Sequence, residues 1–170
     1  MLDQEIARIK IESCLKELII KVDDCLPGQL CGVVHFGSTA GKYVKQQTDV
    51  DVFFIFNKLP QNRKSRMEFF DSFEAIANKD LHTLRNEGFE LCLSPILRTR
   101  QEWFQYHPLL LDLAYCSKVL VDRENCVEKT LLAIELWKAR HGSVRVECGQ
   151  KWYWVLQPGL QPHEVIDFNF

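Results

Sequence analysis

The segment 49–56 constrains the fold more than any other part of the chain, because it reads Asp-Val-Asp-Val-Phe-Phe-Ile-Phe. β-Branched and aromatic residues favour extended backbone, and a short apolar run of this kind is typical of a buried strand. Alternate side chains of a strand share a face, so Asp49 and Asp51 are expected on one face and Val50 and Val52 on the other. The sequence therefore predicts a central strand that begins with two carboxylates.

The elements before residue 98 follow from the spacing of apolar residues. Helical spacing and strand-like runs alternate along this part of the chain, which predicts an α/β fold with a small mixed β-sheet and flanking helices. Pro95 is expected to limit the pairing of its strand or to place that strand at a sheet edge. The predicted elements are a helix over 3–22, a strand over 31–36, a helix over 67–84 that stops at Gly88, and a strand over 89–97.

The remaining residues predict a helical and extended C-terminal segment. Asp122 is a suitable N-cap for a helix that ends near Gly142. The tail from Ser143 is expected to form a strand or hairpin against the body, with Trp152, Tyr153 and Trp154 more plausibly packed in the core than presented to a partner. A helix over 109–115 and a strand over 118–121 precede it, and the whole chain is expected to be one domain with a core of about 1–97 and an extension of about 98–170.

Charge and cysteine content bound the environment and the partners. The chain has 21 Lys and Arg against 23 Asp and Glu, so binding to extended nucleic acid is not expected. Its seven cysteines include no Cys-x-x-Cys pair, and the charged N-terminus contains no apolar signal, which indicates the cytoplasm and cysteines that act as small core residues. No run approaches the roughly 18 apolar residues of a membrane helix.

The two aspartates indicate a metal site. Two carboxylates about 4 Å apart repel by roughly 4 kcal/mol at a protein-like dielectric constant, so the pair favours a bound cation. Mg²⁺ fits best, because it accepts one or two carboxylates and completes its octahedron with water and substrate phosphates.

The Gly37-Ser38 turn before this strand indicates a phosphate site. Glycine lets a backbone approach a ligand closely, and amides after a strand-to-helix turn face an anion. Ser38 adds a hydroxyl donor and Lys42 a positive charge. Together with Asp49 and Asp51, these residues predict binding of a nucleoside triphosphate and Mg²⁺.

Gly37-Ser38, ten intervening residues and Asp49-Val50-Asp51 resemble the signature of the nucleotidyltransferase superfamily that includes DNA polymerase beta. The spacing is similar to that of its minimal prokaryotic members, although Thr39 stands where these often carry arginine. The resemblance implies a nucleotidyltransferase-like fold and a third carboxylate on a neighbouring strand, acting as metal ligand and base, for which Glu90 is the candidate. A solvated Glu90 at a strand start is the alternative, and would leave nucleotide binding without transfer.

The sequence leaves three functional hypotheses open. The first is a Mg²⁺-dependent transfer of a nucleoside monophosphate from an NTP, with ATP the first choice, to a hydroxyl or amine of a protein, small molecule or RNA end. The resemblance implies a companion toxin as one acceptor. The second hypothesis is a non-catalytic, antitoxin-like module that binds a protein partner, and the third is a nucleotide sensor.

Other polar residues are expected to be structural. His35 has apolar neighbours in its predicted strand and is interpreted as a buried histidine rather than a general base. Arg63, Lys64 and Arg66 start the long predicted helix, where their charge opposes the helix dipole, and a solvated face is favoured over a phosphate or RNA contact.

Overall fold

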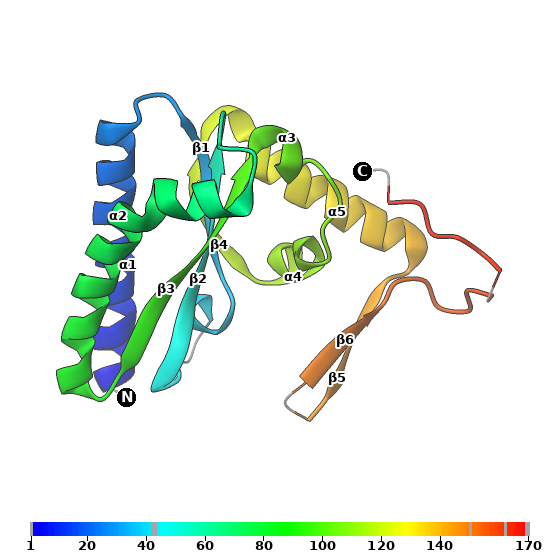
Figure 1. Ribbon diagram of the computed structural model, residues 1–170. Helices are drawn as coiled ribbons and strands as arrows, with labels where there is room; N and C mark the ends of the chain where they lie inside the picture. The colour runs from blue at the N-terminus through cyan, green and yellow to red at the C-terminus, as the bar shows by residue number, and fades with distance from the viewer. Residues whose placement is uncertain (1, 42–43, 150, 162, 169–170) are drawn as a thin grey trace.

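The computed structural model describes residues 2–41, 44–149, 151–161 and 163–168 (Figure 1). A four-stranded sheet of order β3-β2-β1-β4 lies at its centre. β1 pairs antiparallel with both β2 and β4, whereas β2 and β3 run parallel and are joined through a helix. The strands are β1 (Leu30–Phe36), β2 (Gln47–Phe56), β3 (Glu90–Thr99) and β4 (Ser117–Asp122).

Helices cover both faces of this sheet, which confirms the predicted α/β class with a small mixed sheet and flanking helices (Figure 1). One apolar cluster joins α1 (Leu2–Cys25) and α2 (Arg63–His82) to the face that carries Val50 and Val52. A second cluster joins α3 (Arg100–Trp103), α4 (Leu109–Tyr115) and α5 (Cys126–His141) to the opposite face. Within the described residues, no helix combines the length and the apolar character needed to span a bilayer.

Short helical turns connect several of these elements, and one of them leads into α5. The N-cap residue of α5 is Asn125 rather than the predicted Asp122, because η3 intervenes, but the Asp122 carboxylate still accepts 2.9 Å hydrogen bonds from the N–H groups of Val127 and Glu128 in the first turn. α5 ends at His141 and is followed by Gly142 in a left-handed conformation, close to the predicted end. The turns are η1 (Ser38–Ala40), η2 (Thr83–Glu87) and η3 (Arg123–Asn125).

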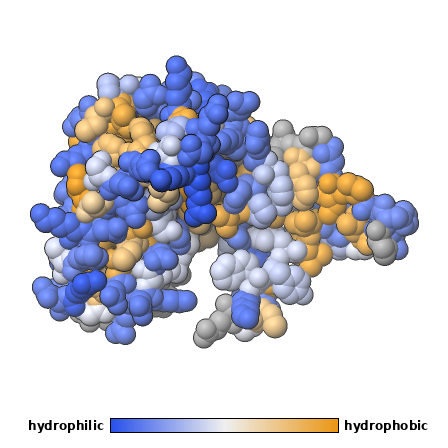
Figure 2. Space-filling model, in the orientation of Figure 1, coloured by the Kyte–Doolittle hydropathy of each residue, from blue (hydrophilic) through white to orange (hydrophobic). Residues whose placement is uncertain are grey.

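A hairpin of β5 (Val144–Cys148) and β6 (Lys151–Val155) follows α5 and projects from the body (Figure 1). The space-filling view shows an open notch between it and the rest of the molecule (Figure 2). The expectation of a core-packed aromatic cluster is wrong for Trp152 and Tyr153, which are 51% and 56% exposed. Because the hairpin forms its own two-stranded sheet, it has no second layer to bury both its faces.

Two indole hydrogen bonds attach this hairpin to α4. Trp152 Nε1 and Trp154 Nε1 both donate to Oδ1 of Asp112, at 3.0 and 2.9 Å. The guanidinium of Arg145 lies over the rings of Tyr115 and Trp152. Trp154 also packs against the second apolar cluster, in line with the expected core packing, so the hairpin is held by one partly buried indole together with polar and cation–π contacts.

Side chains of α2 occupy two backbone groups on the outer edge of β3. The N–H of Leu93 donates to Asn78 Oδ1 at 2.6 Å, and the carbonyl of Leu97 accepts from Arg66 Nη1 at 3.5 Å. Pro95 has no N–H to offer, and its strand lies at the sheet edge, as predicted. This edge therefore presents fewer free groups for pairing with another strand.

The cysteines are only partly core residues. Cys14, Cys31 and Cys126 are buried as expected. The expectation is wrong for the other four, which lie at element ends or on the open face of the edge strand, where no layer covers them: Cys25, Cys92, Cys116 and Cys148.

His35 is buried in β1, as expected. Its Nε2 lies 2.9 Å from Thr39 Oγ1, while Nδ1 has no hydrogen-bond partner among the described residues. Burial, and then the charge of Lys118, lower the pKa of His35 to about 4. The ring is therefore neutral at pH 7 and cannot gain a proton without cost.

We expect the protein to lose stability as the pH falls from about 6.5 to about 4. In this window the unfolded chain binds a proton at His35 and the folded protein does not, so stability is complete above it and is lost on acidification. The loss reaches about 3 kcal/mol at 1.36 kcal/mol per pKa unit. Urea unfolding across this window measures it. His35→Gln flattens the dependence, and the exposed His82→Gln retains it; an unchanged slope in His35→Gln contradicts the assignment.

Candidate active site

The two aspartates of β2 share one face of the sheet. Val50 and Val52 are fully buried on the opposite face, against α1 and α2, which directs the intervening carboxylates to the other side. Asp49 is exposed and Asp51 half-buried. The structure therefore places both acids on one side of an extended segment, as the sequence predicts.

The pKa of the Asp51 carboxyl is raised by its surroundings. Burial raises the pKa of the Asp51 carboxyl, a hydrogen bond from Ser94 lowers it in part, and the charge of Asp49 raises it further. Ser94 is the residue of β3 that lies in register with Asp51. The site thus concentrates negative charge that a cation would stabilise.

The backbone of Gly37 lies directly against the Asp51 carboxylate. Phe36, the last residue of β1, pairs with Asp51, so the turn that follows β1 lies beside this aspartate. Gly37 has φ 74° and ψ −160°, a conformation that is essentially restricted to glycine. A Cβ at this position would overlap Asp51 Oδ2. The turn and the carboxylate pair therefore form one continuous site.

The next two residues fix this turn. The Ser38 hydroxyl lies 2.8 Å from the hydroxyl of Thr48 at the start of β2. Thr39 is 2% exposed, and its hydroxyl forms a hydrogen bond with His35. Its side chain therefore faces the interior rather than a substrate. Lys42, predicted to bind phosphate, lies outside the described residues.

Glu90 lies at the start of β3, on the side of the aspartates. By register it pairs with Gln47, and the residue level with Asp49 is Cys92. A shallow pocket of about 420 Å³ is lined by both Asp49 and Glu90. The Glu90 carboxylate forms a 3.3 Å ion pair with Arg85 and is 55% exposed. Its role as a third metal ligand stays a prediction.

No group of three His, Cys, Asp or Glu side chains is arranged to hold a metal ion in the part of the chain that the structure describes. The expected metal ligands are the carboxylates of Asp49 and Asp51. Glu90 lies two residues before Cys92, the residue of β3 that is level with Asp49. Two carboxylates suffice for Mg²⁺ when substrate phosphates and water supply the other ligands.

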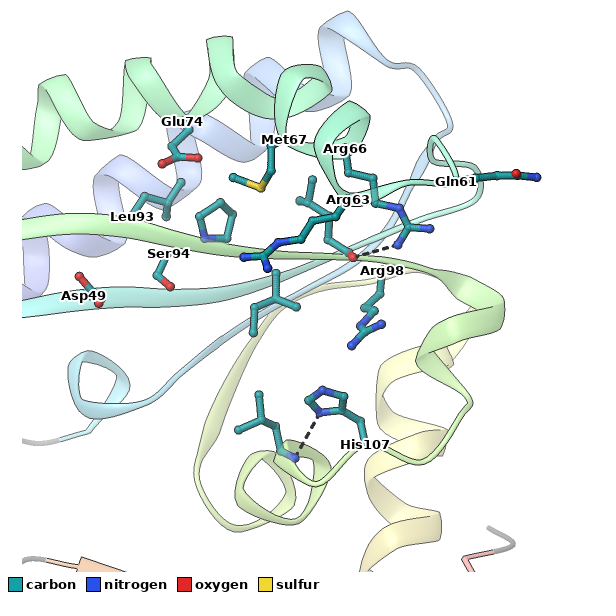
Figure 3. Close-up of a pocket in the computed structure, with 14 residues that line it drawn as sticks. Asp49, Gln61, Arg63, Arg66, Met67, Glu74, Leu93, Ser94, Arg98 and His107 are labelled. Carbon is teal, nitrogen blue, oxygen red and sulfur yellow. Dashed lines mark hydrogen bonds between the residues drawn. The ribbon is translucent and has the colours of Figure 1, made fainter.

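A larger cleft of about 740 Å³ extends from Asp49 along β3 (Figure 3). Three arginines line it: Arg63 and Arg66 from α2, and Arg98 from β3. The sequence does not single out Arg98 or His107, because they carry no motif and meet the aspartates only through the pairing of β2 with β3.

The expected solvated face at the start of α2 is wrong for Arg66. Its guanidinium makes two hydrogen bonds, of 2.7 and 2.8 Å, with the Glu102 carboxylate. This pairing lowers the pKa of Glu102 to about 2. Arg66 therefore ties α2 to α3, whereas Lys64 is solvated as expected, with its side chain 87% exposed.

Comparison with known proteins gives structural matches alone: no family model and no curated protein sequence matches the chain. A chain of a toxin–antitoxin complex with AMP-PNP is 15% identical (TM-score 0.42; 74% of this chain and 91% of that chain covered). A chain of a mutant MntA–HpeT toxin–antitoxin complex is 14% identical (TM-score 0.38; 75% and 92%). The complex of tri-AMPylated Shewanella oneidensis HEPN toxin with MNT antitoxin contains another, at 14% (TM-score 0.36; 82% and 92%). Similarity at this level assigns neither activity nor partner.

We expect Gly37→Ala to destabilise the protein by about 1–3 kcal/mol, because alanine disfavours this backbone conformation and its methyl group meets Asp51. Gly41→Ala is the matched control. Gly41 has φ −79°, and its added Cβ would make an ordinary 3.5 Å contact, so a change within about 0.5 kcal/mol is expected. Urea unfolding of both variants measures this difference, and equal losses would show that the turn is not held against Asp51.

Proposed function

We propose that this protein is a Mg²⁺-dependent nucleotidyltransferase that moves a nucleoside monophosphate from an NTP, with ATP the first to test, to an acceptor hydroxyl or amine. The observation that carries the proposal is the contact between the Gly37 backbone and the Asp51 carboxylate, with Asp49 on the same face. A phosphate seat and a pair of metal-binding carboxylates at one point are what this reaction requires.

The donor set fits Mg²⁺. Both candidate ligands are hard carboxylate oxygens, and the raised pKa of Asp51 reflects the burial and like charge that a divalent ion would relieve. When bound, Mg²⁺ supplies charge neutralisation for the phosphates and polarises the reacting phosphoryl group.

The residues of the chain have separate tasks in this reaction. Gly37 lets the triphosphate approach the turn, and Ser38, held by Thr48, offers a hydroxyl to it. Ser94 orients the Asp51 carboxylate by its hydrogen bond. The acceptor oxygen or nitrogen forms a bond to the α-phosphorus while the bond to the bridging oxygen breaks, and pyrophosphate leaves. The acceptor proton passes to a base, for which Glu90 is the candidate.

Transfer is expected to depend on both aspartates. Asp49→Asn and Asp51→Asn keep the side-chain shape and remove one negative charge each, so we expect a loss of roughly 100-fold or more in pyrophosphate release. The assay uses labelled ATP, GTP, CTP and UTP with Mg²⁺ and cell lysate as the source of acceptor. Asp24→Asn, an exposed aspartate of α1, is the control. Equal activity of all variants and wild type, or no transfer by any, would remove the proposal.

Glu90 is tested against its ion-pair partner. If Glu90 acts as a base or ligand, Glu90→Gln lowers transfer by about 100-fold or more, while Arg85→Gln frees the carboxylate and leaves transfer unchanged or higher. Rates are compared at saturating ATP and Mg²⁺. A Glu90→Gln variant with wild-type rates would show that the base is another group.

The exposed hairpin supports a second candidate function, a module that binds a protein partner. Trp152 and Tyr153 present about half of their surface to solvent, and aromatic residues of this kind are enriched at interfaces. Both residues belong to β6, and the hairpin that contains this strand projects from the body (Figures 1 and 2).

For this module, we expect Trp152→Ala to abolish the capture of a partner from lysate without nucleotide, and Asp51→Asn to retain it. Leu132→Ala, at an exposed leucine of α5, is the control for loss of apolar surface. Capture that requires Asp51 and ATP, or that survives Trp152→Ala, would exclude this function for the hairpin.

A further inference from the structure

The 740 Å³ cleft beside the aspartates is electrically polarised (Figure 3). Asp49 and Glu74 lie toward one end and Arg98 toward the other, near His107, while the Arg63 side chain reaches from α2 into the middle of the cleft on the side of Ser94. Its volume lies within the range of small-molecule sites, roughly 300–1,000 Å³. A ligand that spans the cleft therefore meets a cation-binding end and an anion-binding end.

Two of the three arginines that line the cleft, Arg63 and Arg98, are available to a ligand. Arg66 is committed to Glu102 and to the carbonyls of Pro60 and Leu97. Among the described residues, in contrast, neither Arg63 nor Arg98 forms an ion pair with a carboxylate. Two unneutralised guanidinium groups that face one cavity suit a doubly charged anion, because each presents a fork of N–H donors.

His107 adds a neutral donor to the end of the cleft where Arg98 lies. Its Nδ1 accepts a hydrogen bond from the N–H of Leu109 at 3.3 Å, which leaves Nε2 as the protonated nitrogen. Burial, and then the charge of Arg98, lower the pKa of this ring. His107 therefore adds no charge of its own at pH 7.

The direction of the reaction assigns this cleft to the acceptor. In an in-line displacement the attacking atom enters opposite the leaving group. The phosphate seat at Gly37 follows β1, and the sheet order places β1 and β3 on opposite sides of β2. A pyrophosphate that leaves on the β1 side therefore requires an acceptor on the β3 side, where the cleft lies.

The outer edge of β3 limits the form of this acceptor. The N–H of Leu93 and the carbonyl of Leu97 already have side-chain partners, and Pro95 has no N–H. An extended peptide therefore gains little backbone pairing along the cleft, although six consecutive residues of β3, 93–98, line it. Recognition falls to side chains, which favours a small molecule over a peptide strand.

We propose that this cleft binds a small acceptor that carries a phosphate group, and that Arg63 and Arg98 bind this phosphate. Ser94 lies level with Asp51 and Arg98 level with Ile55, so the backbone of Arg98 lies about 13 Å along the sheet from that of Asp51, at about 3.3 Å per strand residue. The acceptor role rests on the nucleotidyltransferase function proposed above. The phosphate site itself is measurable without turnover.

The test is calorimetric titration with glycerol 3-phosphate in the absence of NTP and Mg²⁺. We expect wild type to bind with a Kd below about 10 mM, and the double variant Arg63→Gln/Arg98→Gln to bind at least about tenfold more weakly. Lys64→Gln, which removes an equal charge from an exposed neighbouring residue, retains wild-type affinity. Circular dichroism establishes that the variants are folded, and Arg98→Gln alone is used if the double variant is not.

Four outcomes overturn the inference: no binding by wild type at about 10 mM, equal affinity of wild type and the arginine variants, equal binding of a glutamate-rich tetrapeptide, or competition by ATP. The last would place the triphosphate at the arginines. Asp49→Asn is expected to keep glycerol 3-phosphate binding while it loses transfer. If transfer proves absent but arginine-dependent binding persists, the nucleotidyltransferase function fails and the phosphate site stands.

Discussion

The pairing of β1 with β2 is the constraint on which the candidate site depends. It places Phe36 opposite Asp51, so that the Gly37 backbone meets the Asp51 carboxylate at the end of the strand. The buried valines on the far side of β2 oppose a shift by one residue, because such a shift would carry the aspartates into the apolar cluster beneath α1 and α2. The register that stabilises the core thus also assembles the site.

The fold places acidic and basic side chains in different parts of the cleft beside β3. Asp49 and Asp51 concentrate negative charge on one face of the sheet. The cleft extends from Asp49 along β3 to Arg98, which is positively charged. The bidentate pair between Arg66 and Glu102 fixes the first turn of α2, which leaves Arg63 directed into the cleft. The two arginines thus differ in role, since Arg66 is committed to an ion pair and Arg63 forms none among the described residues.

Local pattern predicted much of this structure because its signals lie within short segments. A few neighbouring residues were enough to predict each of four features: the alternation around Val50, the turn at Gly37, the capping role of Asp122 and the edge strand at Pro95. The errors involve contacts with distant partners. Burial of the indole of Trp152 depended on whether another layer covers the hairpin, and the role of Arg66 depended on Glu102 in another helix.

The sequence by itself determined the pair of carboxylates on one face of a strand and the glycine turn before it, since both follow from backbone geometry over a few residues. Only the tertiary structure decided what surrounds them: Ser94 beside Asp51, and Arg98 in the same cleft as Asp49. The parallel pairing of β2 with β3 brings these residues together across a long connection. No spacing along the chain encodes such proximity, because the register is set by burial of the entire sheet.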